Sequence, residues 1–295
     1  MSEAAAAPRI VALPGAARGR STLRARLIRT PAAIIGGVLV AVVLVMALAA
    51  PVLAPYDPRA QIAKPLLPPG AGFPAGTDEF GRDELSRLIH GARVSLYVGT
   101  LSVLLALALG GTSGVVAGFC GGVVDDLTMR VMDILLSLPP FVMAIAVTAV
   151  LGPSLTNVMV AIGLVYSPTF ARVARGPTLA VVQRPYIEAA RAIGAPGARI
   201  VVRYVTPNIA APILVQATVS LSQAILLEAA LSFLALGTQP PTPSWGLMLS
   251  TARQYMLIDP WIAVLPGSAI ALTVLGFNLL GDGLRDVLDP QMPAQ

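Results

Sequence analysis

Charged side chains are scarce in this sequence. Only 12% of its 295 residues are Asp, Glu, Lys or Arg, whereas 56% are hydrophobic. A soluble domain of this length carries about 25% charged residues. Together with several long apolar runs, this shortage excludes an ordinary soluble domain and predicts a protein that resides in a bilayer.

Lysine, histidine and cysteine each occur only once, as Lys64, His90 and Cys120. A phosphate-binding P-loop needs a lysine that reaches the nucleotide, but Lys64 precedes Pro65 in a proline-rich segment, so the chain is not expected to hold its own nucleotide site. A single cysteine excludes an internal disulfide, and Cys120 is expected to be a buried apolar residue. His90 has no partners at metal-ligand spacing, so no metal site, cofactor or enzyme activity is expected in this chain.

Six apolar segments have about the 20 residues that a helix needs to cross a bilayer. The first ends in a motif that resembles a signal-peptidase site, but its apolar run exceeds the roughly 7–15 residues of a signal peptide, so an uncleaved anchor is favoured. The sequence therefore predicts an all-α membrane protein with six transmembrane helices. The expected spans are 32–53, 94–118, 130–151, 155–174, 207–236 and 261–281.

Arginine is concentrated in particular segments between these spans. The N-terminal tail at 1–31 has six arginines, and the connection at 171–206 has six more. The segment 54–93 instead balances five basic residues with five acidic ones. Cytoplasmic loops are enriched in Arg and Lys, so we expect the tail at 1–31, the connection and the C-terminal tail at 282–295 to be cytoplasmic, and 54–93 to be external. The basic excess thus indicates membrane orientation and not nucleic-acid binding.

The external segment 54–93 is expected to combine an irregular loop with a surface helix. Six prolines between residues 54 and 75 exclude a regular helix there. From Thr77 the sequence has helix-start chemistry, and Leu85, Leu88 and Ile89 form one apolar face. We therefore expect an amphipathic helix on the outer surface, with His90 exposed to solvent.

The connection between the fourth and fifth spans has the pattern of two short helices. Pro185 suits a first helical position, whereas Gly194 and Pro196 suit a helix stop. Glu188 is spaced to pair with Arg184 or Arg191. Small side chains at 189–190 would let a partner surface approach closely. The pattern predicts a docking element, and the alternative is a helix that only lies on the membrane surface.

A few polar residues fall within the predicted spans. Glu228 lies nineteen residues after Ile209, about 28 Å along a helix and thus near the outer interface. It either shapes an outer gate or pairs with a partner, or it is a solvated helix-end carboxylate. Gln216, Ser220 and Gln223 share one side of the same helix, where they either line a translocation path or bond to a neighbouring helix.

Small and charged residues give two expectations for helix packing. Glycines of the second span suit close helix contact. Arg130 and Asp133, at the start of the third span, are spaced to pair with each other. The four glycines are Gly110, Gly111, Gly114 and Gly118.

The motif of the 171–206 connection resembles that of a known family. Glu188, Ala189 and Ala190, followed by Gly194 and then Pro207, resemble the EAA loop of permeases of ABC importers. Three further segments narrow the resemblance to the second, C-type permease of dipeptide, oligopeptide and nickel importers. They are 76–96, 228–246 and 277–290. Tyr204 and Ala235 depart from this pattern, since many members have histidine and glycine there.

This resemblance implies a fold, a cellular location and a set of partners. The fold would be that of a type I ABC importer (MetI-like), with a five-helix core at 94–281 and a coupling loop at 175–206. Such a permease resides in the bacterial cytoplasmic (inner) membrane among lipid and pairs with a homologous second permease. One or two ABC ATPase subunits would hold ATP and magnesium, and an external binding protein would deliver the substrate.

The resemblance also implies the roles of individual residues and a substrate class. Di- or oligopeptides are the expected cargo, with nickel chelates or another small solute as alternatives. The rival class is a secondary transporter or channel, which would need charged residues near the bilayer midplane, and a third is a non-transporting scaffold. The residues expected to contact the ATPase are Glu188, Ala189, Ala190, Arg191, Gly194, Arg199 and Pro207.

Overall fold

The computed structural model of the chain describes residues 30–70 and 72–288. These described residues form no β-strand and contain only isolated bridges between residues 61 and 83. Most of the tail predicted at 1–31, and the last part of that predicted at 282–295, lie outside them. The helices are α2 (Pro31–Leu48), α3 (Ala50–Leu53), α4 (Glu84–Ala106), a π-helical turn (Leu107–Gly111), α5 (Thr112–Cys120), α6 (Gly122–Leu136), α7 (Pro140–Leu151), α8 (Leu155–Val182), α9 (Pro185–Ala192), α10 (Gly197–Ile200), a second π-helical turn (Val201–Val205), α11 (Thr206–Phe233), α12 (Trp245–Tyr255) and α13 (Trp261–Leu288).

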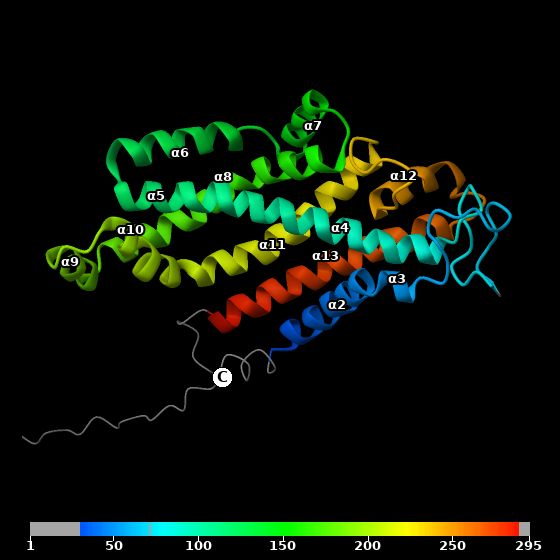
Figure 1. The fold of residues 1–295 in the computed structure, drawn as a ribbon, viewed down its shortest axis with the longest axis horizontal. Helices are drawn as coiled ribbons and strands as arrows, with labels where there is room; N and C mark the ends of the chain where they lie inside the picture. The colour runs from blue at the N-terminus through cyan, green and yellow to red at the C-terminus, as the bar shows by residue number, and fades with distance from the viewer. Residues whose placement is uncertain (1–29, 71, 289–295) are drawn as a thin grey trace, which may run out of the picture.

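Most of these helices run along the long axis of the molecule (Figure 1). Five helical stretches are long and apolar enough to cross a bilayer: α2, α4 with α5, α8, α10 with α11, and α13. The bent pair of α6 and α7 is a candidate for a sixth. The predicted all-α membrane fold is therefore confirmed. The helices α9 and α10 lie at one end, called here the α9 end, and the segment 54–83 lies at the other, called the loop end.

The third predicted span is wrong in its shape. We expected one helix over 130–151, but α6 already begins at Gly122 and ends at Leu136, and α7 begins at Pro140 with a bend of 89° between them. Pro139 and Pro140 cause the break, because proline lacks an N–H and disfavours helical geometry in the residue before it. The predicted single helix is thus two helices joined at a sharp bend.

The predicted surface helix at 77–90 is also wrong. Its second half is the first part of α4, which begins at Glu84 and continues without a break through the second span. The carboxylate of Asp83 caps this helix by accepting the N–H of Ser86 at 2.8 Å. Asp83, Glu84 and Arg87 are all buried, and His90 is half-buried with Nδ1 3.0 Å from the carbonyl oxygen of Ser86.

The helix α8 lies at the centre of the bundle and packs closely against α4, α5, α6, α7 and α11. A Cβ atom added at Gly110 would overlap the carbonyl oxygen of Ser167, and one at Gly114 would overlap that of Ala171. A Cβ at Gly118 would lie 2.9 Å from Cβ of Thr178. These glycines let two backbones touch, as expected for small residues between membrane helices. Gly111 differs, because its added Cβ would meet only Leu107 of the same helical stretch.

Two ion pairs join α6 to α8. Asp133 lies 2.6 Å from Arg172, and Asp125 lies 2.5 Å from Arg175. The expected pair between Arg130 and Asp133 is therefore replaced by a bond between helices. The helices α6 and α8 run in opposite directions, and both pairs join α6 to the second half of α8.

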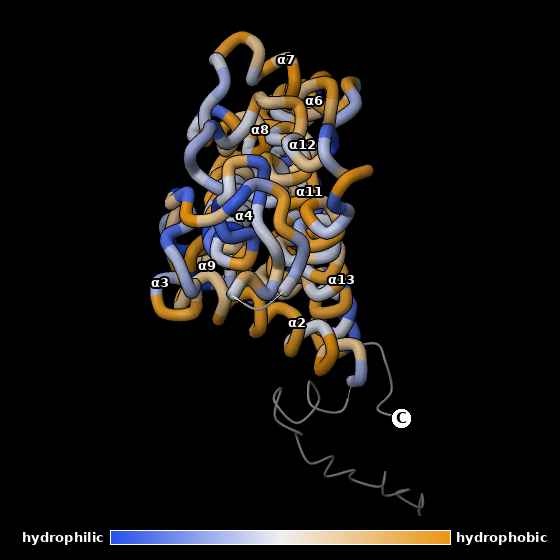
Figure 2. The backbone as a smooth tube through the Cα atoms, turned by 90° about the vertical axis from the view of Figure 1, so that its right-hand side faces the viewer, coloured by the Kyte–Doolittle hydropathy of each residue, from blue (hydrophilic) through white to orange (hydrophobic). Residues whose placement is uncertain are grey.

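The helices α2, α12 and α13 form a second group against α4 and α11. The close approach of α2 to α13 again depends on glycine, because a Cβ at Gly276 would lie 2.9 Å from Cβ of Leu39. The apolar contacts of this group include Val43, Trp245 and Phe277. Figure 2 looks onto the loop end and shows hydrophilic backbone around the start of α4 among largely hydrophobic helices.

Cys120 is exposed, which contradicts the expectation that it is buried. It is the last residue of α5, and the chain turns at Gly121, where φ is +67°. The exposure of Cys120 follows from its place at the end of the helix and not from the apolar character of its side chain.

The backbone contact between α5 and α8 predicts the effect of adding a single methyl group. In Gly114→Ala the new Cβ would overlap the carbonyl of Ala171, and such overpacking costs about 1–3 kcal/mol. We expect a lower midpoint of thermal unfolding for the purified protein in detergent. The control is Gly176→Ala on α8, where an added Cβ has no atom within 4 Å. Equal midpoints for the two variants would contradict the packing described here.

Candidate functional site

The connection between α8 and α11 forms a helix, a sharp stop and a second short helix. The helix α9 ends in a motif in which the N–H of Gly194 binds the carbonyl of Arg191 at 2.9 Å and the N–H of Ala195 binds that of Ala190 at 3.0 Å. This double closure needs a left-handed residue, and Gly194 has φ +80°. The sequence pattern of Gly194 and Pro196 thus produces the expected break between α9 and α10.

One face of this connection is fastened to the spans by apolar contacts. Ile187 of α9 and Ile200 of α10 are almost completely buried, at 0% and 1% exposure. They belong to a cluster, called here the coupling cluster, that draws residues from α8, α9, α10, the second π-helical turn and α11. Its members are Ala174, Val181, Ile187, Ala190, Ile200, Val205 and Ile209. A displacement of α9 would therefore be passed to both long helices.

The opposite face of α9 is open. Glu188, Ala189 and Arg191 are exposed, and Ile193 is 84% exposed. Ala190 is 5% exposed and packs inward, so only one of the two alanines expected to receive a partner is available to it.

Other candidate residues of the connection are also accessible. Gly194, Arg199 and Pro207 are exposed, as are Glu188 and Arg191 of α9. A partner could thus contact a surface that extends from α9 past α10 to the start of α11.

The charged residues of α9 do not pair as expected. The carboxylate of Glu188 makes no ion pair within 4.0 Å with Arg184 or Arg191, which are both among the described residues. The guanidinium of Arg191 instead lies 5.6 Å from the ring centre of Phe119 at the end of α5. Glu188 is therefore an exposed anion that no arginine of its own helix neutralises.

Glu228 is buried and not solvated, so the idea of a solvated helix-end carboxylate is wrong. Its side chain is 0% exposed and accepts hydrogen bonds from Ser232 at 2.7 Å and from Ser95 of α4 at 3.2 Å. The hydroxyl of Ser232 in turn accepts the N–H of Thr238 at 3.1 Å. Glu228 thus joins α11, α4 and the segment before α12, and it faces the interior of its own chain.

The three polar residues predicted to form one stripe on α11 do not share one surface in the structure. The amide of Gln216 donates to the hydroxyl of Ser220 at 3.0 Å, and Ser220 is completely buried. Gln223 is exposed on another part of the helix surface. Gln216 lines a groove of about 590 Å³ that Arg285 of α13 also borders. The stripe therefore contains one bond within the helix and one free amide.

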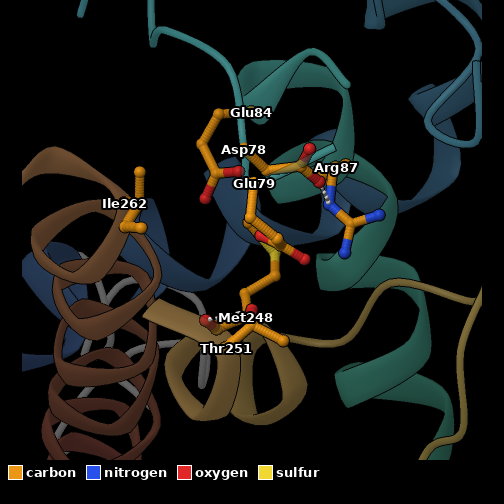
Figure 3. Close-up of a pocket in the computed structure, with 7 residues that line it drawn as sticks. All are labelled: Asp78, Glu79, Glu84, Arg87, Met248, Thr251 and Ile262. Carbon is orange, nitrogen blue, oxygen red and sulfur yellow. Dashed lines mark hydrogen bonds and ion pairs between the residues drawn. The ribbon is translucent and has the colours of Figure 1, made fainter. Parts of the chain in front are cut away.

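A buried ionic cluster at the start of α4 was missed by sequence reasoning. Asp78 lies 2.6 Å from Arg82 and 3.1 Å from Arg87, and Glu79 lies 3.1 Å from Arg82. Figure 3 shows the carboxylate of Glu84 directed into a small cavity beside this cluster. The sequence contains a pattern that could have revealed this cluster, because opposite charges recur three and four residues apart between positions 78 and 87.

The cluster is shielded from solvent by α12 and α13. Met248, Thr251 and Ile262 border its cavity. Burial raises the pKa of Glu79 above its ordinary value, although a backbone hydrogen bond partly opposes this shift. The ionic cluster therefore stabilises the loop end as a buried network, whereas the sequence predicted that these charges lie on a solvated surface.

The described residues contain no group of three or more His, Cys, Asp or Glu side chains that could hold a metal ion. The main feature of the site is the open face of α9, whose opposite face packs against the long helices.

The coupling cluster predicts that two isoleucines of the same loop respond differently to truncation. Ile187→Ala removes a buried side chain, which costs about 2–5 kcal/mol, and should loosen α9 from α8. We expect faster trypsin cleavage after Arg191 and Arg199 in the folded protein. The control is Ile193→Ala, because Ile193 is 84% exposed. Trypsin should cleave this variant at the same rate as the parent protein. Equal cleavage rates in these two variants would contradict the fastening of α9.

Comparison with solved structures supports the fold independently of these contacts. The inward-facing MetNI methionine ABC transporter matches with a TM-score of 0.55 and 20% sequence identity. The match covers 70% of this chain and 98% of the transporter chain. At this identity the likeness shows the fold alone, which is the MetI-like fold expected from the sequence.

Comparison with known sequences shows the family. The chain is 48% identical over 266 residues to the di/tripeptide transport system permease protein DppC of Pseudomonas aeruginosa, with 88% of each chain covered. It is 42% identical over 269 residues to the glutathione transport system permease protein GsiD of Pectobacterium atrosepticum, covering 90% of this chain and 89% of the relative.

Two family models match along the chain. Residues 20–69 match the N-terminal TM domain of oligopeptide transport permease C. Residues 110–293, more than half of the chain, match the model described as binding-protein-dependent transport system inner membrane component. The chain therefore belongs to the family of inner membrane components of binding-protein-dependent transport systems, as a permease of the C type.

Proposed function

We propose that this chain is one of two permease subunits of an ATP-driven importer of di- or oligopeptides in the bacterial inner membrane. Its relatives include permeases named for dipeptides, for di- and tripeptides and for glutathione. The observation that carries the proposal is the geometry of α9, which is fastened to the spans on one face and open on the other. That is the arrangement a subunit needs in order to receive force from a separate motor.

The motor would consist of one or two ABC ATPase subunits that dock on the α9 end. This chain has one lysine, Lys64, and it lies at the loop end, where no P-loop is formed. ATP and magnesium would therefore be held by the partner subunits. Exposed Glu188 would meet a basic group of the ATPase, since an interface charge contributes most when its partner has the opposite sign.

The arginine distribution supports the orientation of the chain. The connection that includes α9 has six arginines in 171–206, so the α9 end would face the cytoplasm, as would both termini. The loop end would then face outward. There a substrate-binding protein would deliver its cargo to the path between this chain and the second permease.

In this account the coupling cluster converts a movement of the ATPases into a movement of the spans. Ile187 and Ile200 couple α9 and α10 to α8 and α11, so all four would move together. Glu228 would act at the other end of α11, where its bonds to Ser95 and Ser232 hold the outer segment in place. The buried carboxylate is thus proposed to support an outer gate, not to line it.

One observation favours a second class. Glu228 is a buried acid within a span, as a proton-coupled secondary transporter would need. Three features of its surroundings weigh against that role. Two hydroxyls donate to it, it is completely buried within its own chain, and it forms no ion pair with a basic side chain among the described residues. Uptake that needs a proton gradient and no ATP would favour the second class.

Reversal of the exposed charge on α9 tests the proposed docking. In Glu188→Arg the permease should still insert, but co-purification of the ATPases and peptide uptake should both fall by on the order of tenfold or more. Gly194→Asp should act likewise, because Asp is strained at φ +80° and the stop after α9 would be distorted.

The matched control for this test is Asp57→Arg, the same charge reversal at an exposed residue of the loop end. It should leave ATPase binding unchanged. Normal yields of co-purified ATPase in both Glu188→Arg and Gly194→Asp would refute docking on α9.

Substitution of Glu228 separates a structural role from a role of its charge. Glu228→Gln keeps one oxygen that can accept from a serine hydroxyl and gains an NH2 group that can donate to the oxygen of the other, so uptake and thermal stability should stay close to those of the parent. Glu228→Ala leaves these buried hydroxyls without their acceptor, which costs about 1–3 kcal/mol, and should lower both. Loss of uptake in Glu228→Gln at unchanged stability would instead assign the charge a direct role in transport.

A further inference from the structure

A groove between α2 and α4 combines apolar walls with one charged side chain. Its volume is about 330 Å³. Leu44 and Leu48 of α2 face Leu96 and Leu101 of α4 across it. Arg93 is the only charged residue among the described ones that border it. The groove is therefore amphipathic, with its charge on the side of α4.

The polar side chains of the groove have no partners in the described part of the chain. Arg93, Tyr97 and Thr100 follow one another at spacings of four and three residues, so they share one face of α4, and all three are exposed. Neither the guanidinium of Arg93 nor the hydroxyls of the other two bond to another described residue. Arg93 thus presents five N–H donors and a positive charge that no described acidic residue matches.

The helix α2 indicates the depth of this charge in the bilayer. Its 18 residues extend over about 27 Å, close to the ~30 Å of a hydrocarbon core. Leu44 and Leu48 are among its last five residues, so the groove lies at the hydrocarbon boundary nearer the loop end. Glu84, where α4 begins, is nine residues before Arg93, or about 13 Å further out. Arg93 is therefore at the boundary between headgroups and hydrocarbon.

The walls of the groove suit a flexible chain better than a second helix. Close contacts between membrane helices favour small residues, and this chain uses Gly114 and Gly276 in that way. The groove instead has large side chains at its rim, where Leu48 is 81% exposed and Tyr97 is 52% exposed. Such side chains hold a straight helix away from α4, whereas a lipid acyl chain can follow the space between them.

We propose that this groove binds an anionic phospholipid, with the phosphate on Arg93 and one acyl chain between α2 and α4. Phosphate oxygens accept the N–H groups of arginine in charge-assisted hydrogen bonds, and the positive charge favours an anionic headgroup. Tyr97 lies one turn deeper, and tyrosine is enriched at the interfaces of membrane proteins. The inference goes beyond the proposed function, because it needs only a chain that spans a bilayer.

The lipid would complete a helix contact that the chain leaves open on one side. Val43 and Ala47 of α2 pack against Ala92 and Leu96 of α4 in the apolar cluster that also includes Trp245. The groove opens beside this contact. A lipid that fills the groove binds only the folded arrangement of the two helices, so it should raise the stability of the folded protein.

Lipid titration of the full-length protein, purified in detergent with any subunits that it retains, tests the site. After endogenous lipid is removed, dioleoylphosphatidylglycerol is added. Native mass spectrometry follows lipid binding, and the midpoint of thermal unfolding is measured in parallel. The variant is Arg93→Gln. Its control is Arg59→Gln, the same exchange at an exposed arginine of the loop end that does not border the groove. Thr100→Trp is a second variant, which keeps the charge and fills the groove.

We expect Arg93→Gln to weaken the tightest phosphatidylglycerol binding by on the order of tenfold, because the charge-assisted bonds to the phosphate are lost. The rise in the unfolding midpoint that the lipid causes should shrink accordingly. Thr100→Trp should weaken binding as well, whereas Arg59→Gln should match the parent. Glycerophosphoglycerol, which has the same headgroup without acyl chains, should not displace the lipid.

Equal lipid binding by Arg93→Gln and Arg59→Gln would overturn the inference. Displacement of the lipid by glycerophosphoglycerol would also overturn it, since the site would then recognise a phosphate ester without using the groove. A third contrary result is loss of a co-purifying subunit from Arg93→Gln at unchanged lipid binding, which would assign the groove to a protein partner. None of these results depends on whether ATP drives uptake, so the proposed function is tested separately.

Discussion

The backbone contact between α5 and α8 is the constraint on which the other features of this permease depend. Gly114 lets the two helices touch, so α8 occupies the centre of the bundle. The same helix carries Ala174 and Val181, to which α9 is fastened. It also carries Arg172, whose ion pair with Asp133 joins α8 to α6. A single well-packed helix thus connects the surface proposed to receive an ATPase with the core of the bundle.

The two ends of the molecule are built with different interactions, which suits different tasks. At the α9 end, apolar contacts hold one face of α9 and the other face is open, so the helix could bind a partner and still move with the spans. At the loop end the contacts are ionic and hydrogen-bonded, and they are buried under α12 and α13. Removing one partner from such a network leaves a buried charge, which is costly. We therefore regard the loop end as the rigid part of the chain and the α9 end as the part that would respond to the proposed ATPases.

Hydropathy and helix signals predicted the spans and the two short helices of the connection, because both depend on local sequence. The errors at Glu228 and Asp133 share one physical cause, which is contact between distant parts of the chain. Glu228 is at the predicted distance along α11, but only the folded chain shows Ser95 beside it. Asp133 has a suitable partner on its own helix and binds Arg172 instead. The bend at Pro139 was readable from two adjacent prolines, but the apolar residues on either side led to a prediction of one continuous helix.

The central claim is that ATP hydrolysis on separate subunits drives peptide movement through this chain. The most direct test is peptide uptake into proteoliposomes that contain the two permeases and the ATPases, with the binding protein outside and ATP inside. The account predicts uptake that stops when ATP is omitted and continues when ionophores abolish the proton and sodium gradients. Uptake that persists without ATP and collapses on addition of the ionophores would contradict it.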